Sequence, residues 1–249
     1  MRAILTYHSI DESGSPNSMS EDVYRTQIAW LARSRVRVVS LDALMRMSPD
    51  EDAVSLTFDD AFVSFGDVAA PLLAEHGLPS TLFVVTDAAG ATNRWSGGVD
   101  RGIPELPLLR WESLGRLVEQ GVHLGAHTRT HVDLARASGR QLRDEVAGSA
   151  ERIASETGRA PSAFAYPYGS VSDAAVGLVA QCFDWGCTTE MRSVARNEAR
   201  ALLPRIDMYY LRSPGQLERW GTLGFRCHLT IRAGARLVRH RFRTLTGQR

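Results

Sequence analysis

The sequence lacks several features that would assign a protein to a class at once. Its 29 basic residues are all arginine, and its formal net charge of +1 gives no overall field that points to nucleic acid. The three cysteines, Cys182, Cys187 and Cys227, form neither a paired disulfide framework nor a CxxC metal motif. No apolar run approaches the ~20 residues that a membrane-spanning helix needs. The 249 residues therefore suit a globular protein of one large or two small domains.

Targeting and nucleotide-binding signals are also missing. The N-terminal stretch MRAILTYHSIDESG has too short an apolar run for a signal peptide and no small-residue cleavage pattern. We therefore expect a soluble, cytoplasmic protein. The chain contains neither a GxGxxG motif nor a P-loop. The commonest dinucleotide-binding and nucleotide-binding functions of α/β proteins are therefore excluded. We expect no nucleic-acid partner.

The sequence does contain a regular alternation of short apolar runs and helix-like segments. Strands are predicted at residues 4–10, 36–40, 53–58, 80–85, 122–128, 162–169, 185–190 and 202–208. Helices are predicted at residues 21–33, 41–47, 111–120, 139–157 and 172–181, with a further helix that ends near residue 75. This βα unit repeats about seven times without a domain break. A closed barrel and an open doubly wound sheet both fit the pattern.

Polar residues gather where the predicted strands end. They are His8, the pair Asp59 and Asp60, His127, and the segment 166–169. In a βα barrel the carboxyl ends of the strands form the active-site face. This placement is hard to explain by packing and indicates a functional site.

Two pairs of residues could carry metal chemistry. Asp59 and Asp60 are adjacent, which does not suit the glycosidase arrangement of two carboxylates ~5–9 Å apart across a bond. His127 and His131 have the i, i+4 spacing that puts two imidazoles on one face of a helical turn. By itself HxxxH is a weak signal. Together, one aspartate and two histidines supply three ligands and leave a coordination position open, while the second aspartate can act as a base.

Three motifs in order, LTFDD, HTRTH and AYPYG, resemble those of the polysaccharide deacetylases, carbohydrate esterase family four. The segments ILTYHSI and LPRID are similar to a branch that includes poly-N-acetylglucosamine deacetylases. The resemblance covers roughly residues 1–210. It implies an α/β fold, a distorted (β/α)7 TIM-like barrel in a single domain at residues 1–225, and metal-dependent hydrolysis of an N-acetyl or O-acetyl group.

The resemblance also implies roles for individual residues. Asp59 is the expected general base, and Asp60, His127 and His131 are the expected metal ligands. The backbone N–H of Tyr168 is expected to stabilise the developing oxyanion.

Two departures from the family pattern matter. The third motif commonly begins with an arginine that orients the base, and Ala165 stands there. The histidine that commonly serves as general acid near the C-terminus has no convincing counterpart. We hypothesise that Arg205 orients Asp59 and that His8 donates the proton to the leaving amine. A histidine held by hydrogen bonds at the barrel mouth is an equally good interpretation of His8.

Aromatic residues complete the predicted site. Trp95 in the long loop is expected to form a platform for a sugar ring, while Tyr166 and Trp185 are assigned to the substrate pocket. Ordinary packing explains Trp185 equally well. The interpretation as a whole is a deacetylase of an acetylated amino sugar, with an amidase or imidase on a non-sugar C–N bond and a catalytically silent glycan-binding barrel as alternatives.

The expected cofactor is one divalent metal ion. Two imidazoles and a carboxylate favour Zn²⁺, and Co²⁺, Ni²⁺ or Mn²⁺ also fit these ligands.

The C-terminal segment 226–249 has no acidic residue and seven arginines interleaved with apolar residues. These are Arg226, Arg232, Arg236, Arg239, Arg241, Arg243 and Arg249. Such a segment can lie on an anionic membrane surface, or it can be a solvated tail or a helix packed on the barrel.

Overall fold

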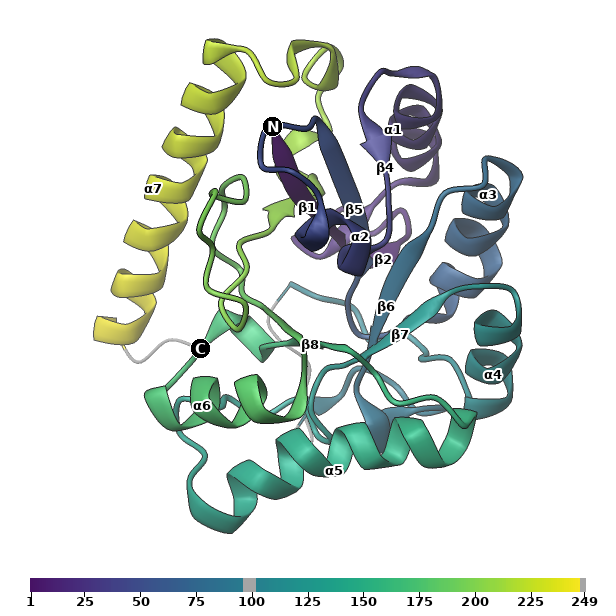
Figure 1. Cartoon of the computed structure of the whole chain (residues 1–249), viewed down its shortest axis with the longest axis vertical. Coiled ribbons are helices and arrows are strands. Elements are labelled where there is room, and N and C mark those ends of the chain that lie inside the picture. The colour runs from purple at the N-terminus through teal and green to yellow at the C-terminus, as the bar shows by residue number, and fades with distance from the viewer. Residues whose placement is uncertain (96–101, 247–249) are drawn as a thin grey trace.

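One curled parallel sheet, ringed by helices, forms the centre of the molecule (Figure 1). The computed structural model describes residues 1–95 and 102–246, with side chains described up to residue 234. The strands of the sheet are β1 (Arg2–Tyr7), β4 (Arg37–Val38), β5 (Ala53–Phe58), β6 (Ser80–Val84), β7 (His123–Ala126), β8 (Ala163–Ala165), β9 (Trp185–Cys187) and β10 (Ile206–Asp207). A small second sheet pairs β2 (Ser9–Ile10) with β3 (Ser18–Met19).

The main sheet has the order β10-β1-β5-β6-β7-β8-β9, with β4 paired to the first half of β5. All of these strand pairs are parallel. Among the described residues, β9 meets the segment before β10 through one bridge between Cys187 and Leu203. The Leu203 amide donates to the Gly186 carbonyl at 2.7 Å at this point. The sheet therefore closes incompletely, and it is the distorted (β/α)7 barrel that the sequence predicts.

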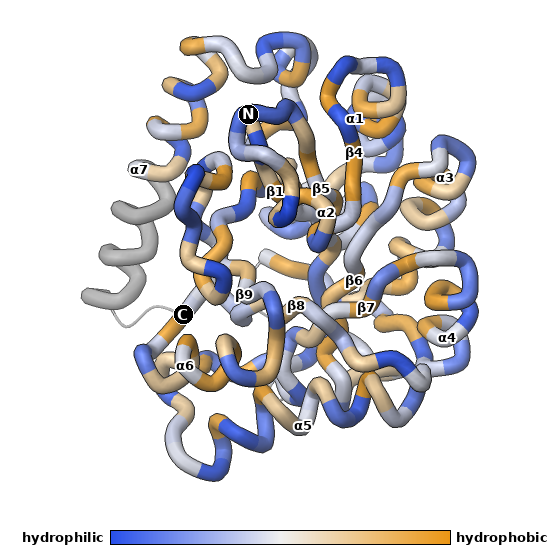
Figure 2. Tube along the Cα trace, viewed as in Figure 1, coloured by the Kyte–Doolittle hydropathy of each residue, from blue (hydrophilic) through white to orange (hydrophobic). Residues whose placement is uncertain are grey.

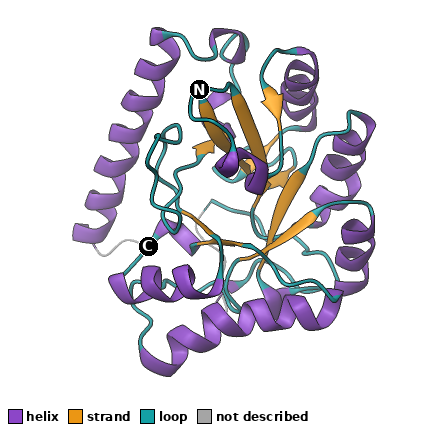
Figure 3. Cartoon of the chain, in the orientation of Figure 1, coloured by secondary structure: helices purple, strands orange, loops and turns teal. Residues whose placement is uncertain are grey.

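Helices surround this sheet on its outer face (Figure 3). They are α1 (Glu21–Arg33), α3 (Ala70–Glu75), α4 (Trp111–Glu119), α5 (Gly139–Thr157), α6 (Asp173–Cys182) and α7 (Leu223–Thr246). Helix α5 ends at Gly158, whose φ of 69° is the left-handed conformation that favours glycine after a helix. Within the described part of the chain, no helix combines the length and apolarity needed to cross a bilayer.

Helix α2 (Leu41–Arg46) fills the amino-terminal end of the barrel instead of covering its outside (Figure 1). Leu41 and Leu44 form one cluster with Ile4 and Phe83, which point inward from β1 and β6. Alternate residues of the same strands face outward and join the larger core under the helices. Apolar packing thus fills much of this end of the barrel, and the polar strand-end residues His8, Asp59 and His127 lie at the other end.

The predicted boundary at residues 225 and 226 falls inside α7. Phe225 and Leu229, in the first turns of this helix, are buried and belong to the larger core. The start of the predicted basic segment therefore packs on the barrel. The side chains of residues 235–249 lie outside the described residues.

Candidate active site

The candidate site lies at the carboxyl end of the barrel, where polar residues follow the strands directly. His8 follows β1, Asp59 follows β5, and His127 follows β7. Backbone bonds continue the ladder into these positions, since the Asp59 amide donates to the Tyr7 carbonyl at 3.0 Å and the His127 amide to the Val84 carbonyl at 2.9 Å. The sheet itself therefore fixes where these side chains begin.

Asp59 and Asp60 both reach the site, although neighbouring residues of a strand point to opposite sides. Asp59 continues the inward series of Ser55 and Thr57 along β5. Asp60 breaks the strand with a φ of 71°, which swings its carboxylate toward the same side. The two side chains are buried, with relative exposures of 3% and 4%. The turn at the strand end allows one pocket to receive both carboxylates.

His127 and His131 meet in a loop and not on a helical turn, which corrects the basis of the sequence argument. The segment after β7 has no helix, and Thr128 and His131 have φ values of 64° and 60°. The Thr128 hydroxyl accepts a hydrogen bond from the His131 amide at 2.9 Å and closes the loop from inside. The imidazole rings come to rest with centroids 4.9 Å apart.

These two histidines and Asp60 form a compact set of possible metal ligands. The Nε2 atoms of His127 and His131 each lie 3.5 Å from Asp60 Oδ1, and all three atoms lie within 4.8 Å of one another. Donor atoms held ~2.0–2.2 Å from a tetrahedral Zn²⁺ are roughly 3.3–3.5 Å apart. The spacing, the burial of all three residues and the N/N/O donor set therefore fit one divalent cation.

Both imidazoles are prepared to act as ligands. His127 Nδ1 lies 2.7 Å from the Ala165 carbonyl, which favours the tautomer with its proton on Nδ1 and a lone pair on Nε2. Burial lowers the pKa of His127 to about 4, although the charge of Asp59 opposes this change. Burial also lowers the pKa of His131 well below its ordinary value, and His127 adds to the effect. Both rings are therefore neutral near pH 7, as metal ligation requires.

Asp59 is held by Arg205 in a two-pronged ion pair. Arg205 NH1 and NH2 donate to Asp59 Oδ1 and Oδ2 at 2.6 and 2.8 Å. Its remaining bonds go to the Thr188 carbonyl and the Thr6 hydroxyl, and the residue is 1% exposed. Burial alone would raise the pKa of Asp59, but the charge of Arg205, with help from His127 and His8, holds it well below its usual range. Asp59 is therefore ionised near neutral pH, and Arg205 fixes the orientation of its carboxylate.

His8 completes the group around Asp59. Its Nε2 atom lies 3.7 Å from Asp59 Oδ2, and its side chain is 22% exposed. His8 thus combines contact with the carboxylate and access from solvent. The structure brings together six predicted residues at one end of the barrel, namely Asp59, Asp60, His127, His131, Arg205 and His8.

Aromatic rings line the approach to His131. The Trp95 ring stacks on the His131 imidazole with centroids 4.4 Å apart and an interplanar angle of 28°. Tyr168 meets the same imidazole edge-on, and its hydroxyl lies 3.2 Å from His131 Nδ1. Tyr168 is 48% exposed. The mouth of the site therefore presents flat apolar faces next to the ligand cluster.

Backbone strain is concentrated at this site. In the described part of the chain, the non-glycine residues with positive φ are Asp60, Ala61, Thr128, His131 and Tyr168. Each such residue costs ~1–3 kcal/mol, which the surrounding structure must offset. All of them belong to the site or its immediate loops, so the fold holds these loops in conformations that they would not adopt alone.

The structure contradicts two predicted substrate contacts. Tyr166 is 0% exposed, because it continues the outward series of Phe164 along β8 and packs in the outer core. Trp185 points inward but stands at the start of β9, at the other end of the barrel. Its indole Nε1 donates to Asp42 Oδ1 at 2.5 Å. Neither side chain reaches the site.

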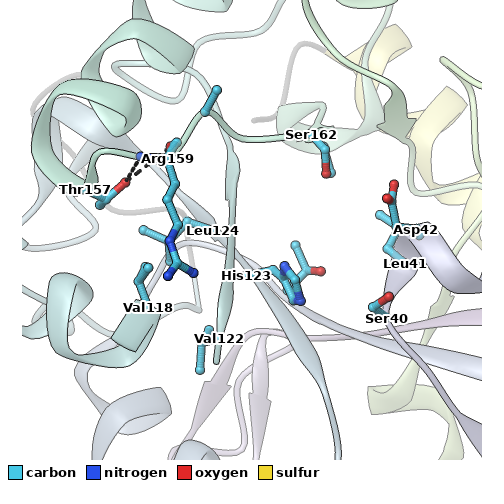
Figure 4. Close-up of a pocket in the computed structure, with 13 residues that line it drawn as sticks. Ser40, Leu41, Asp42, Val118, Val122, His123, Leu124, Thr157, Arg159 and Ser162 are labelled. Atoms are coloured by element: carbon cyan, nitrogen blue, oxygen red, sulfur yellow. Dashed lines mark hydrogen bonds between the residues drawn. The ribbon is translucent and has the colours of Figure 1, made fainter. Parts of the chain in front are cut away.

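A cavity lies at the amino-terminal end of the barrel (Figure 4). It has a volume of about 140 Å³ and is lined by residues of α2 and of the beginnings of β6, β7 and β8. Asp42, His123 and Arg159 are among its polar side chains. None of the candidate catalytic residues lies there, and we assign it no part in the reaction.

A (β/α)7 barrel that carries two histidines and one aspartate beside a clamped carboxylate defines a class of metal-dependent hydrolase. The family model for polysaccharide deacetylases matches residues 46–183 of this chain. The chain belongs to the polysaccharide deacetylase family, and it is accordingly a hydrolase of C–N bonds in acetylated carbohydrates.

Similar proteins agree with this assignment. The chain is 22% identical over 203 residues to the poly-beta-1,6-N-acetyl-D-glucosamine N-deacetylase of Staphylococcus epidermidis, covering 76% of this chain and 67% of that protein. A Streptococcus pyogenes deacetylase solved with acetate has a TM-score of 0.70 and 24% identity, covering 82% of this chain and 91% of the other. IcaB from Ammonifex degensii has a TM-score of 0.69 and 21% identity, covering 90% and 96%. These structures share the fold.

Proposed function

We propose that the chain removes the N-acetyl group of an amino sugar in a glycan or glycoconjugate, with Asp59 as the general base. The observation that carries this proposal is the arrangement of the two aspartates. Asp60 belongs to the possible ligand cluster, while Asp59 is held next to it as a carboxylate by Arg205. The sequence similarity to a poly-beta-1,6-N-acetyl-D-glucosamine N-deacetylase supports an amino-sugar substrate.

Asp60, His127 and His131 would hold the metal ion, for which we propose Zn²⁺ because it takes imidazole and carboxylate ligands and can leave one position open. When bound, such an ion polarises a carbonyl oxygen and makes water more acidic.

The protein's own residues then account for each proton and bond. Asp59 accepts a proton from the attacking water, whose oxygen bonds to the acetyl carbonyl carbon. The Tyr168 N–H donates to the carbonyl oxygen as negative charge develops there, a contribution worth ~3–4 kcal/mol in comparable sites. His8 donates a proton to the leaving nitrogen, the C–N bond breaks, and acetate and a free amino sugar result. Trp95 provides a flat surface for the sugar ring.

A screen for acetate release tests the substrate class. Metal-loaded protein is expected to release acetate from N-acetylated glucosamine oligomers in a reaction that a chelator stops and that added Zn²⁺ restores. The readout is acetate formed, measured beside free amine. Release from small non-sugar amides, with none from the oligomers, would favour the amidase alternative. Binding of oligomers without any acetate release would favour the silent barrel.

We further propose that the outer face of α7 contacts an anionic membrane surface. Leu223 and Ile231 are 82% and 70% exposed, and Cys227 between them is also exposed. Their i, i+4, i+8 spacing puts them on one face, whereas Phe225 and Leu229 are buried against the barrel. Figure 2 shows the mixture of apolar and polar positions along the start of this helix. Residues 226–249 contain seven arginines and no acidic residue, so their positive charge is complementary to an anionic surface.

Sedimentation with vesicles tests the membrane proposal. The chain is expected to sediment with vesicles that contain about one-third phosphatidylserine and not with pure phosphatidylcholine. Binding needs both the attraction of the arginines to anionic lipid, which is short-ranged in salt, and insertion of the exposed apolar side chains. The double variant Leu223→Ser/Ile231→Ser should lose most of this binding. Val171→Ser, which alters an exposed apolar residue outside α7, is the matched control. Equal sedimentation with both vesicle types, or none with either, would contradict the proposal.

A further inference from the structure

Glu145 is a buried carboxylate on a helix face where the other residues pack. It lies on α5 with Leu142, Val146, Ser149 and Ile153, all of them buried, and it is itself 7% exposed. A carboxylate removed from water needs hydrogen-bond donors to replace the solvent. The hydrogen-bond donors around Glu145 therefore indicate its role.

Within the described residues Glu145 accepts three hydrogen bonds, and all of them come from the loop between His127 and His131. Its Oε2 atom accepts from the backbone N–H of Arg129 at 2.9 Å and from that of Thr130 at 3.0 Å. Its Oε1 atom accepts from the Thr130 hydroxyl at 2.6 Å. One side chain of α5 thus anchors the short segment that separates the two imidazoles.

The Arg129 guanidinium is engaged elsewhere. Its NH2 group lies 2.8 Å from Asp87 Oδ2, and its Nε donates to Asp87 Oδ1 at 3.2 Å. The contacts of Glu145 with this loop are therefore to backbone N–H groups and one hydroxyl. Their geometry fixes the path of the main chain, which a flexible surface ion pair would not do.

This loop needs an anchor because its ends are strained. Thr128 and His131 both have positive φ, a conformation that residues with a Cβ adopt rarely. Thr128 bonds the His131 amide from inside the loop, and Glu145 holds the loop from outside. Without the outer anchor the loop is free to relax toward ordinary φ values, and the His131 ring would move relative to His127.

We propose that Glu145 is a positioning residue that sets the affinity of the His127 and His131 pair for a divalent cation. The inference rests on the proposed function in assuming that these imidazoles bind the ion. Glu145 bonds to Arg129 and Thr130, between the two histidines, and acts through the backbone of the loop. Groups that orient metal ligands from outside commonly change metal affinity by ~10–100-fold when they are replaced.

The test compares Glu145→Ala and Glu145→Gln with Glu151→Gln, an exposed glutamate on the same helix. The dissociation constant for Zn²⁺ is measured on the full chain by competition with a chromogenic chelator, at a temperature where circular dichroism shows every variant folded. Glu145→Ala should raise this constant by ~10–100-fold. Glu145→Gln, whose amide oxygen can still accept from the backbone, should raise it by less. Glu151→Gln should match the wild type.

Amide hydrogen exchange of the metal-free proteins gives a second measurement. Exchange of the amides of residues 128–131 should be faster in Glu145→Ala than in the wild type, while exchange in the strands stays unchanged. The proposal would be overturned if amide exchange in this loop were the same in Glu145→Ala as in the wild type. It would also be overturned if Glu145→Ala bound Zn²⁺ with the wild-type dissociation constant and only its unfolding temperature fell. A third outcome is that the wild-type chain binds no Zn²⁺ while amide exchange in the loop is still faster in Glu145→Ala. This result would refute the metal centre and the role of Glu145 in metal affinity, but Glu145 would still be an anchor of the loop.

Discussion

Replacing Asp59 by asparagine is expected to lower turnover by roughly 10²–10⁴-fold, the usual contribution of a general base. The amide cannot accept the proton of the attacking water, while Asp60, His127 and His131 remain in place. One metal ion per chain should therefore still bind. Acetate release and metal content, measured on the same preparation, separate these two effects.

Stability should change in the same variant. Arg205 is 1% exposed and would lose the carboxylate that pairs with it, so the free energy of unfolding should fall by about 3–5 kcal/mol. The kinetics must therefore be measured well below the unfolding temperature. Asp67→Asn removes a charge from an exposed position in the segment that follows β5 and is the matched control. Turnover within a few-fold of the wild type in Asp59→Asn would remove Asp59 from the mechanism.

Replacing Arg205 by alanine is the second large effect that we expect. In the native protein the pKa of Asp59 lies well below its ordinary value because Arg205 outweighs the effect of burial. Without Arg205, burial raises the pKa, and the base becomes protonated over a wider acidic range. Turnover should fall by roughly 10²-fold or more at about pH 8, and further at about pH 5.5. The pH–rate profile of acetate release measures this change.

A further variant shows whether the loss of turnover in Arg205→Ala comes from the bidentate contact. Arg205→Lys retains a charge but cannot form the bidentate contact, so its turnover should lie between those of the wild type and Arg205→Ala. An unaltered rate in Arg205→Ala would show that the ion pair only supports the fold.

His8→Gln tests the proposed proton donor. It alters a partly exposed neighbour of Asp59, so it should lower turnover with little effect on stability. Metal content should stay at the wild-type level throughout.

Much of the site could be predicted because residues that follow parallel strands must meet at one end of the sheet. Asp59, His127 and His8 were all recognisable as strand-end residues, and the structure places them together. Arg205 was inferred from a missing arginine at Ala165. The segment that contains Arg205 bridges to β9 at Leu203 and then continues into β10. This path brings Arg205 into contact with Asp59, which is 146 positions away in the sequence.

The errors arose where local geometry decides the direction of a side chain. Tyr166 follows a strand end like the others, but the two-residue period turns it outward into the core. Trp185 faces inward at the wrong end of its strand. Glu145 was overlooked, although its signal was available. A carboxylate at position 145 falls on the apolar face of the predicted helix 139–157, where a charge needs a specific partner.

The amino-acid sequence by itself determined the alternation of strands and helices, the end of the barrel that carries polar residues, and the chemical types in the site. These follow from periodicity and residue chemistry, which are local properties. The tertiary structure alone decided how Asp60 turns into the pocket, how the two histidines converge from a strained loop, and that Arg205 holds Asp59 by a bidentate contact. Each of these depends on backbone angles and partners far away in the chain, which no local pattern specifies.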